Sequence, residues 1–233
     1  MPRLSRFCPS GHPCHIIQRG NDRQDCFLDA MDFSLYASWL KNYSHVNRVS
    51  IHAWVFMTNH VHLLATPEDD FGISKLMQSL GRNYVRYFNK KYHRTGTLWE
   101  GRFKSCLVDT ENYLFNCYRY IEENPVRAKM VSHPEHYKWS SYHCNANGKE
   151  SKLCKPHPLY LELGMNDNAR QRAYEDLFEG HLRDSIVNKI RKCINTGDIL
   201  GDELFIDGIE KKHNITIKRK KVGRPKKNNQ HTT

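Results

Sequence analysis

A chain of 233 residues is long enough for one sizeable domain with an appendage, or for two small domains. Its hydrophobic content of 39% can fill a core, and its formal net charge of +11 favours an anionic partner. No stretch approaches the roughly 18 apolar residues of a membrane span, and no apolar signal segment precedes the first predicted strand. The sequence therefore predicts a reduced, cytoplasmic protein without a membrane partner.

The positive charge is concentrated in two segments of the sequence. Residues 75–104 carry eight Lys or Arg and one acid, and residues 211–227 carry nine Lys or Arg and no acid. These segments have net charges of +7 and +9, which leaves −5 on the rest of the chain. Two basic patches on a mildly acidic body are more typical of nucleic-acid binding than of general solubility.

After a loose lead-in over residues 1–11, the sequence alternates short apolar strands with amphipathic helices. Runs rich in β-branched and aromatic residues predict four strands, at residues 15–18, 50–56, 60–66 and 105–108. Apolar residues at helical spacing predict helices at residues 30–46, 73–88 and 111–123. Thr110 is the expected cap of the last helix, and Gly81 would permit close packing inside the second. The resulting order is β-α-β-β-α-β.

Two histidines flank one apolar residue in the third predicted strand. In an extended strand His60 and His62 point to one face, while Val61, Leu63 and Ala65 point to the other face and into a core. Adjacent imidazoles on a rigid strand can chelate a divalent metal ion. Fourteen histidines in this chain give about one His-x-His pair by chance, so the pair alone also fits an ordinary strand.

The predicted helix at residues 111–123 can bring a phenol and an amide together at its C-terminal end. Tyr120 and Asn124 are four residues apart and share a helix face. Pro125 biases Asn124 away from helical geometry, so the helix should end there. A tyrosine on a helix is most often a core residue, and the pattern alone does not single out Tyr120 from its neighbour Tyr118.

Cations on the helix at residues 73–88 and in the following loop are the candidate phosphate contacts. The helix cations lie opposite its apolar face, where they could bind phosphate or simply be solvated. In the loop, cations alternate with glycines and with Trp99, which could stack on an unpaired base or be buried. With two cations of the C-terminal tail, the candidate DNA contacts are Lys75, Arg82, Arg86, Lys90, Arg94, Trp99, Arg102, Lys104, Lys220 and Arg224.

Five stretches between residues 12 and 145 have a specific order and spacing. They are IIQRGN at 16–21, AWVFMTNHVH at 53–62, GTLWEGRFK at 96–104, YIEENPVRA at 120–128 and WSSY at 139–142. Together they resemble the single-tyrosine HUH transposases of the insertion-sequence 200-like family, particularly the REP-associated tyrosine transposases. The resemblance is far more specific than a bare His-x-His pair, and it covers somewhat over half of the chain.

The resemblance implies an α+β fold for residues 1–145, with a ferredoxin-like antiparallel sheet and helices packed on one face. It implies that His60 and His62 bind a metal ion, that Asn124 completes the metal site, and that Tyr120 is the nucleophile. Two imidazoles and an amide are neutral ligands, so Mg²⁺ or Mn²⁺ is the expected cofactor.

The function that this resemblance implies is cleavage and transfer of single-stranded, hairpin-forming DNA by a transposase. Tyr120 would attack a phosphodiester beside the metal ion, giving a 5′-phosphotyrosine and a free 3′-hydroxyl. Two alternatives stay open. One is a DNA-hairpin-binding protein that has lost cleavage, and the other is an unrelated metal hydrolase with an acidic ligand from Glu68, Asp69 or Asp70. The sequence leaves the oligomeric state open.

Beyond the resemblance, residues 146–210 show helical fragments that follow a polar connection over residues 145–158. This region could be a DNA-binding accessory or a structural appendage. Residues 211–233 form a basic tail that we expect to be disordered. In it, Gly223-Arg224-Pro225 resembles the centre of an AT-hook, which places arginine in a minor groove, although Val222 stands where a hook has arginine.

Overall fold

A computed structural model describes residues 6–216 and contains a four-stranded antiparallel sheet with strand order β2-β3-β1-β4. The strands are β1 (Cys14–Arg19), β2 (Val49–Phe56), β3 (His60–Pro67) and β4 (Lys104–Leu107). Each predicted strand is present to within one residue at either end. Every neighbouring pair is antiparallel: β3 folds back from β2 and also pairs with β1, and β1 pairs with β4 on its other side. The α+β, ferredoxin-like prediction is confirmed.

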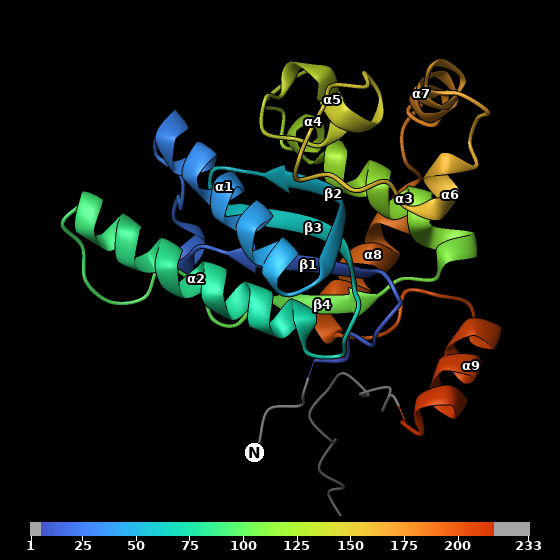
Figure 1. Cartoon of the computed structure of the whole chain (residues 1–233), viewed down its shortest axis with the longest axis horizontal. Coiled ribbons are helices and arrows are strands. Elements are labelled where there is room, and N and C mark those ends of the chain that lie inside the picture. Colours follow the sequence, from blue (N-terminus) through green and yellow to red (C-terminus); the bar gives the residue numbers. More distant parts are fainter. Residues whose placement is uncertain (1–5, 217–233) are drawn as a thin grey trace, which may run out of the picture.

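Helices α1 (Ala30–Val46) and α2 (Gly72–Lys91) pack together on one face of the sheet (Figure 1). The apolar stripe that predicted α2 is buried against α1 and the sheet. It consists of Ile73, Leu76, Met77, Leu80, Tyr84 and Phe88. Burying one such side chain contributes about 1.5–3 kcal/mol, so the stripe far outweighs the cost of about 1 kcal/mol for a glycine in the helix interior. That glycine, Gly81, packs against the Trp99 indole, whose Nε1 would lie 3.6 Å from a Cβ at position 81, an ordinary van der Waals distance.

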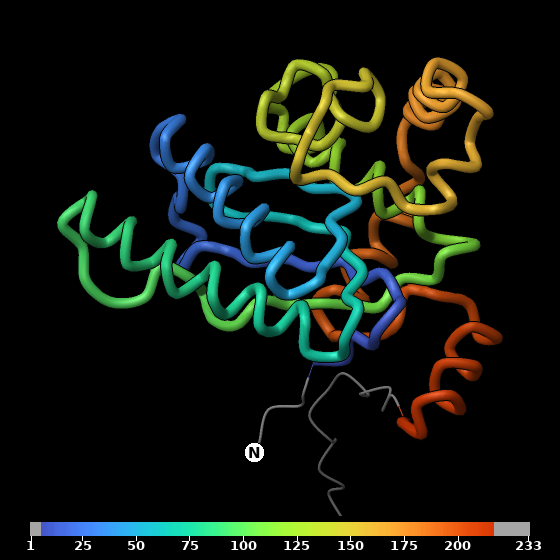
Figure 2. Tube along the Cα trace, in the orientation of Figure 1, coloured from blue at the N-terminus to red at the C-terminus, as the bar shows by residue number. Residues whose placement is uncertain are grey.

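Helices also cover the opposite face of the sheet, which corrects the expectation that they would lie on one face only. Helix α3 (Thr110–Glu122) packs on β2 and β3, and α8 (Asp184–Thr196) packs on β4 and β1. Figure 2 traces α8 beside β4 although the two are far apart in the sequence. The physical reason lies in the strands, because alternate residues such as Val55, Leu64 and Cys106 are also apolar on this second face.

The ends of α3 differ slightly from the prediction. Asp109, not Thr110, caps the helix, because its Oδ1 accepts a 3.0 Å hydrogen bond from the Glu111 backbone N–H. The helix stops at Glu122, and a short helix, α4 (Asn124–Arg127), follows with Pro125 in its first turn. Proline is favoured there because it has no N–H to donate and its φ suits a helix start.

The remaining described segments pack around this sheet. They are α5 (Tyr142–Asn145), α6 (Pro158–Leu161), α7 (Asp167–Asp176), α9 (Glu203–His213) and two 3-10 turns at Asn21–Arg23 and Pro134–His136. The expected polar connection is fixed to the edge of the sheet, because the Lys155 N–H donates to the Ile51 carbonyl at 2.7 Å. None of the helices within residues 6–216 is long and apolar enough to cross a membrane.

Helix α9 extends further than the sequence suggested. It continues through Lys211 and Lys212 to His213, residues that the sequence analysis assigned to a disordered tail. Cations in the last turn of a helix are favoured by the partial negative charge there, which accounts for the extension. The other tail candidates, Lys220 and Arg224, lie outside the described residues.

Candidate active site

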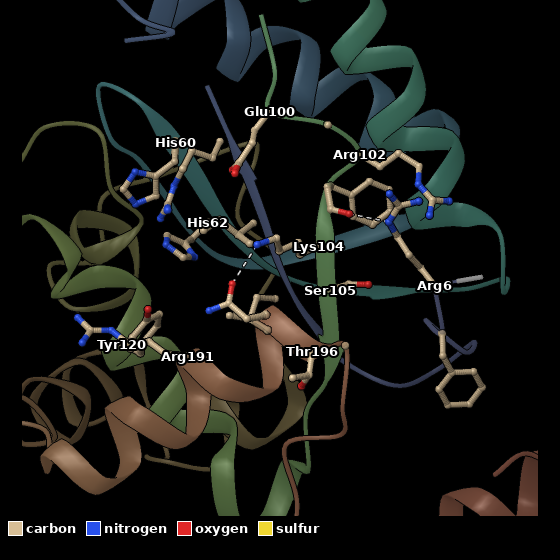
Figure 3. Close-up of a pocket in the computed structure, with 18 of the residues that line it drawn as sticks. Arg6, His60, His62, Glu100, Arg102, Lys104, Ser105, Tyr120, Arg191 and Thr196 are labelled. Atoms are coloured by element: carbon tan, nitrogen blue, oxygen red, sulfur yellow. Dashed lines mark hydrogen bonds between the residues drawn. The ribbon is translucent and has the colours of Figure 1, made fainter. Parts of the chain in front are cut away.

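An open cleft of about 680 Å³ lies where β1 ends and β3 and β4 begin (Figure 3). Strand residues form its floor, the end of α3 and the start of α4 form one side, and α8 forms another. Its lining includes Ile17, Arg19, His60, His62, Lys104, Tyr120, Asn124, Arg191, Ile194 and Asn195. The four residues to which the resemblance gave chemical roles therefore meet in one cleft.

His60 stands at the start of β3 with its imidazole held by a neighbouring amide. Its Nδ1 donates a 2.6 Å hydrogen bond to Asn59 Oδ1, which leaves the lone pair on Nε2. Burial lowers the pKa of His60 to about 4, and the positive charge of Arg19 acts in the same direction, while a hydrogen bond with Asn124 opposes them. His60 is therefore neutral at physiological pH and can act as a metal ligand.

His62 pairs with a third histidine that sequence analysis did not assign to the site. Its Nδ1 lies 2.8 Å from His15 Nε2, and the two rings stack with centroids 5.0 Å apart. Burial, together with the neighbouring histidines, lowers the pKa of His62 well below its usual value, and burial lowers the pKa of His15 to about 3. The other ring nitrogen of His15, Nδ1, is buried and has no hydrogen-bond partner among the described residues.

Tyr120 lies in the last turn of α3, with its ring fixed between two groups. Its edge-on neighbours on one side are His15 and His62, with ring centroids 5.5 and 5.7 Å away. The Arg127 guanidinium lies 4.4 Å from the centroid of the Tyr120 ring and also donates to the Tyr120 backbone carbonyl. Its neighbour Tyr118 is fully buried in the core beneath α3 and does not line the cleft.

Comparison with known proteins finds a protein family whose model matches the part of the chain that carries these residues. The family model described as "Transposase IS200 like" matches residues 9–124, which contain all of the cleft residues that come from the sheet, together with Tyr120 and Asn124. The chain belongs to the IS200-like transposase family. No curated protein matches the sequence significantly.

Two solved structures are similar to this IS200-like transposase. One is a REP-associated tyrosine transposase bound to a REP hairpin, with 19% identity and a TM-score of 0.51 over 67% of this chain and 93% of that chain. At that identity the likeness establishes the shared fold. The other is a candidate transposase from Deinococcus radiodurans, with 20% identity and a TM-score of 0.35 over 56% of this chain and 92% of its own.

Only some of the predicted DNA contacts lie at the cleft of this transposase. Arg102 and Lys104 line it, together with Arg6, Arg19 and Arg191, which the sequence did not suggest. The α2 cations are exposed on the helix that covers the opposite face of the sheet, and none of them lines the cleft; they are Lys75, Arg82, Arg86 and Lys90. Arg94 donates to Gln24 Oε1 at 2.8 Å outside the cleft.

Trp99 fits the buried alternative and not the stacking platform for a base. Only 6% of its surface is exposed, and its ring stacks on Tyr84 with centroids 5.9 Å apart. Its proposed role in DNA binding is therefore corrected, because the neighbours of its ring are core residues of the α2 side.

The acidic ligands required by an unrelated hydrolase are not at the histidine pair. Glu68, Asp69 and Asp70 follow the far end of β3 and do not line the cleft. Within residues 6–216, no group of three or more His, Cys, Asp or Glu side chains is arranged to hold a metal ion. A metal ion on His60 and His62 would therefore need the Asn124 amide as a further protein ligand.

Proposed function

We propose that this protein cleaves and transfers single-stranded DNA that carries a hairpin, with Tyr120 as the nucleophile. The observation that carries the proposal is the meeting of Tyr120, His60 and His62 in one cleft lined by cations. The related transposase of known structure is bound to a REP hairpin, and we extend a DNA hairpin to this chain as its proposed partner. We also propose a cytoplasmic location, in keeping with its eight free cysteines.

The side chains at the cleft fit a divalent metal ion, which we propose to be Mg²⁺ or Mn²⁺. Asn59 and His15 contact the Nδ1 atoms of His60 and His62, so the Nε2 atoms of both rings are free to bind a metal ion. In that state His62 Nδ1 carries the proton and donates it to His15 Nε2. The Asn124 side chain lies next to His60 in the same cleft, where its amide oxygen would be the third protein ligand. When bound, the ion would neutralise a phosphate oxygen and polarise phosphorus.

The protein groups account for the remaining chemistry. The Tyr120 hydroxyl oxygen attacks phosphorus, the bond from phosphorus to the 3′-oxygen breaks, and the proton lost by the phenol is balanced by one taken up at the 3′-oxygen. Arg127 holds the phenol ring in place during the attack. One phosphate ester replaces another, so the step is reversible. A different 3′-hydroxyl can then attack the phosphotyrosine, which joins the two DNA strands and releases Tyr120. This reversibility suits strand transfer better than hydrolysis.

The test is a search for a covalent protein–DNA adduct with labelled hairpin DNA, a single-stranded flank and Mn²⁺. The full chain should form the adduct, and Tyr120→Phe should abolish it while hairpin affinity is retained. Tyr118→Phe is the matched control, because Tyr118 lies on the same helix but is buried in the core away from the cleft, and removing its hydroxyl leaves the ring that fills the core. Normal adduct yield from Tyr120→Phe would refute the nucleophile assignment. Hairpin binding by the unaltered chain without any adduct would support the binding-only alternative.

A further inference from the structure

Helix α8 builds part of the cleft although it lies beyond the region that matches the family, which ends at residue 124. The helix is strongly amphipathic, and its buried face packs on β4, β1 and α3 through Val187, Ile190, Cys193 and Ile194. This packing fixes the direction of the other face. Arg191 and Asn195 are one helical turn apart, and both line the cleft, whereas the exposed neighbour Lys192 does not.

A direct contact joins α8 to the sheet across the cleft. Lys104 Nζ donates a 3.0 Å hydrogen bond to Asn195 Oδ1, as the dashed line in Figure 3 shows. Because Lys104 begins β4, this bond connects the floor of the cleft to the side that α8 forms. A strand of DNA in the cleft would therefore contact α8 as well as the sheet.

The charges at this wall are not compensated by the protein. Arg191 is exposed, and no carboxylate within residues 6–216 forms an ion pair with it. Figure 3 draws its side chain on the same side of the cleft as Tyr120. Its positive charge reaches Arg127, where it adds to the effect of burial in lowering the pKa of Arg127. Arg127 itself is paired with Glu123 at 3.3 Å, so of these two guanidinium groups near Tyr120 it is Arg191 that no carboxylate within residues 6–216 neutralises.

The balance of charge in the cleft favours an anion. Five cations line it, and Glu100 is the only carboxylate among the described lining residues. The C-terminal end of α8 also faces the cleft, but its partial charge is only about −0.5. The net field therefore attracts a phosphodiester.

We propose that α8 is part of the DNA-binding surface and that Arg191 binds a non-bridging oxygen of the phosphate that Tyr120 attacks. This inference rests on the proposed function and extends it to residues 146–210, the region that contains α8. A guanidinium offers two parallel N–H donors that match two phosphate oxygens, which a lysine does not. Its charge would also stabilise the negative charge that these oxygens carry during attack.

The experiment compares Arg191→Gln with Lys192→Gln, a matched loss of one charge on the adjacent residue of the same helix. Binding of a single-stranded oligonucleotide is measured across several salt concentrations in the Tyr120→Phe background, where no cleavage interferes. Arg191→Gln should reduce the magnitude of the log–log salt slope by about 0.7, the value for one phosphate contact. Lys192→Gln should leave the slope unchanged.

The rate of adduct formation at saturating hairpin DNA and Mn²⁺ supplies the second readout. Arg191→Gln should slow it by about 10²- to 10³-fold, the usual effect of removing one charge-stabilising donor. The rate of adduct formation by Arg191→Lys should lie between the rates of the unaltered chain and of Arg191→Gln. Equal slopes and equal rates for Arg191→Gln and Lys192→Gln would overturn the proposal. A changed slope with an unchanged rate would overturn the assignment to the attacked phosphate.

The two proposals fail separately in this design. If the unaltered chain forms no adduct, cleavage is refuted, but the salt slopes still decide whether Arg191 binds a phosphate. Circular dichroism of each variant checks that α8 remains folded, which is expected because both substituted side chains are exposed.

Discussion

Replacing His15 with phenylalanine should weaken Mn²⁺ binding at His60 and His62 by about ten- to a hundredfold while the protein remains folded. Phenylalanine fills nearly the same space but removes the nitrogen that contacts His62 Nδ1 at 2.8 Å. A metal ion on His62 Nε2 requires a proton on Nδ1, and His15 Nε2 is the atom that accepts it. Without that acceptor, the Nδ1–H is buried beside a hydrocarbon ring.

The magnitude follows from the burial of both rings. His15 is fully buried and His62 is 2% exposed, so water does not replace the lost partner. Leaving a buried donor unpaired costs about 1–3 kcal/mol, in the range of the ten- to hundredfold losses usual when a group behind a metal-binding histidine is removed. Stability should change less, because the same substitution removes the unpartnered Nδ1 of His15.

Calorimetric titration of the full chain with Mn²⁺ measures this effect without using activity. His52→Phe is the matched control, because His52 is also buried on the sheet but bonds to the Lys155 carbonyl and Thr66 Oγ1, away from the cleft. It should lower the melting temperature and leave Mn²⁺ affinity unchanged. His15→Gln, which keeps an acceptor, should restore part of the affinity. Unchanged Mn²⁺ affinity in His15→Phe, or an equal loss in His52→Phe, would refute the reasoning.

The other predictions concern acid stability and the basic tail. Burial lowers the pKa of His15 to about 3 and of His52 and His60 to about 4, so between pH 6.5 and 4 the unfolded chain binds protons that the folded chain does not. Below pH 6.5 the free energy of unfolding should therefore decrease, as the pH is lowered, by about 1.4 kcal/mol per pH unit for each of the three histidines. Urea unfolding at pH 7 and 5.5 measures this loss, and equal stability at both pH values would contradict the prediction. Removing residues 217–233, which contain seven Lys or Arg, should reduce the magnitude of the single-strand salt slope by up to about 5 and leave cleavage at saturating DNA unchanged. An unchanged slope would mean that the tail does not contact DNA.

Local periodicity accounts for what the sequence could predict. The alternation in His60-Val61-His62-Leu63 is a property of one strand, and the structure places Val61 and Leu63 in the core and both histidines on the opposite face. The same holds for α2, whose apolar stripe and neighbouring cations follow from helical spacing alone. In both cases the information lies within one element of the fold.

The residues that sequence reasoning missed are those that depend on pairing between distant elements. His15 reaches His62 only because β1 pairs antiparallel with β3 in a register that places Ile17 opposite His62. Arg191 reaches the cleft only because α8 packs on β4. The sequence left open whether Trp99 is buried or stacks on a base, and its burial depends on packing against Tyr84 of α2, outside its own loop. A predicted register for β1 and β3 would have been enough to find His15.

The helix that carries Tyr120 is fixed by hydrogen bonds to two other segments, and one of these segments, α7, lies within residues 146–210. Two residues after Tyr120, Glu122 is fully buried and accepts hydrogen bonds from Ser141, Asn145 and Tyr174, the last of which belongs to α7. Burial raises the pKa of Glu122 to about 7 even against these three donors. A buried carboxylate that loses one of its donors costs more than an ordinary hydrogen bond, so the position of α3 is coupled to α7. With α8 forming part of the cleft, residues 146–210 contribute both to the position of Tyr120 and to the surface that DNA would contact.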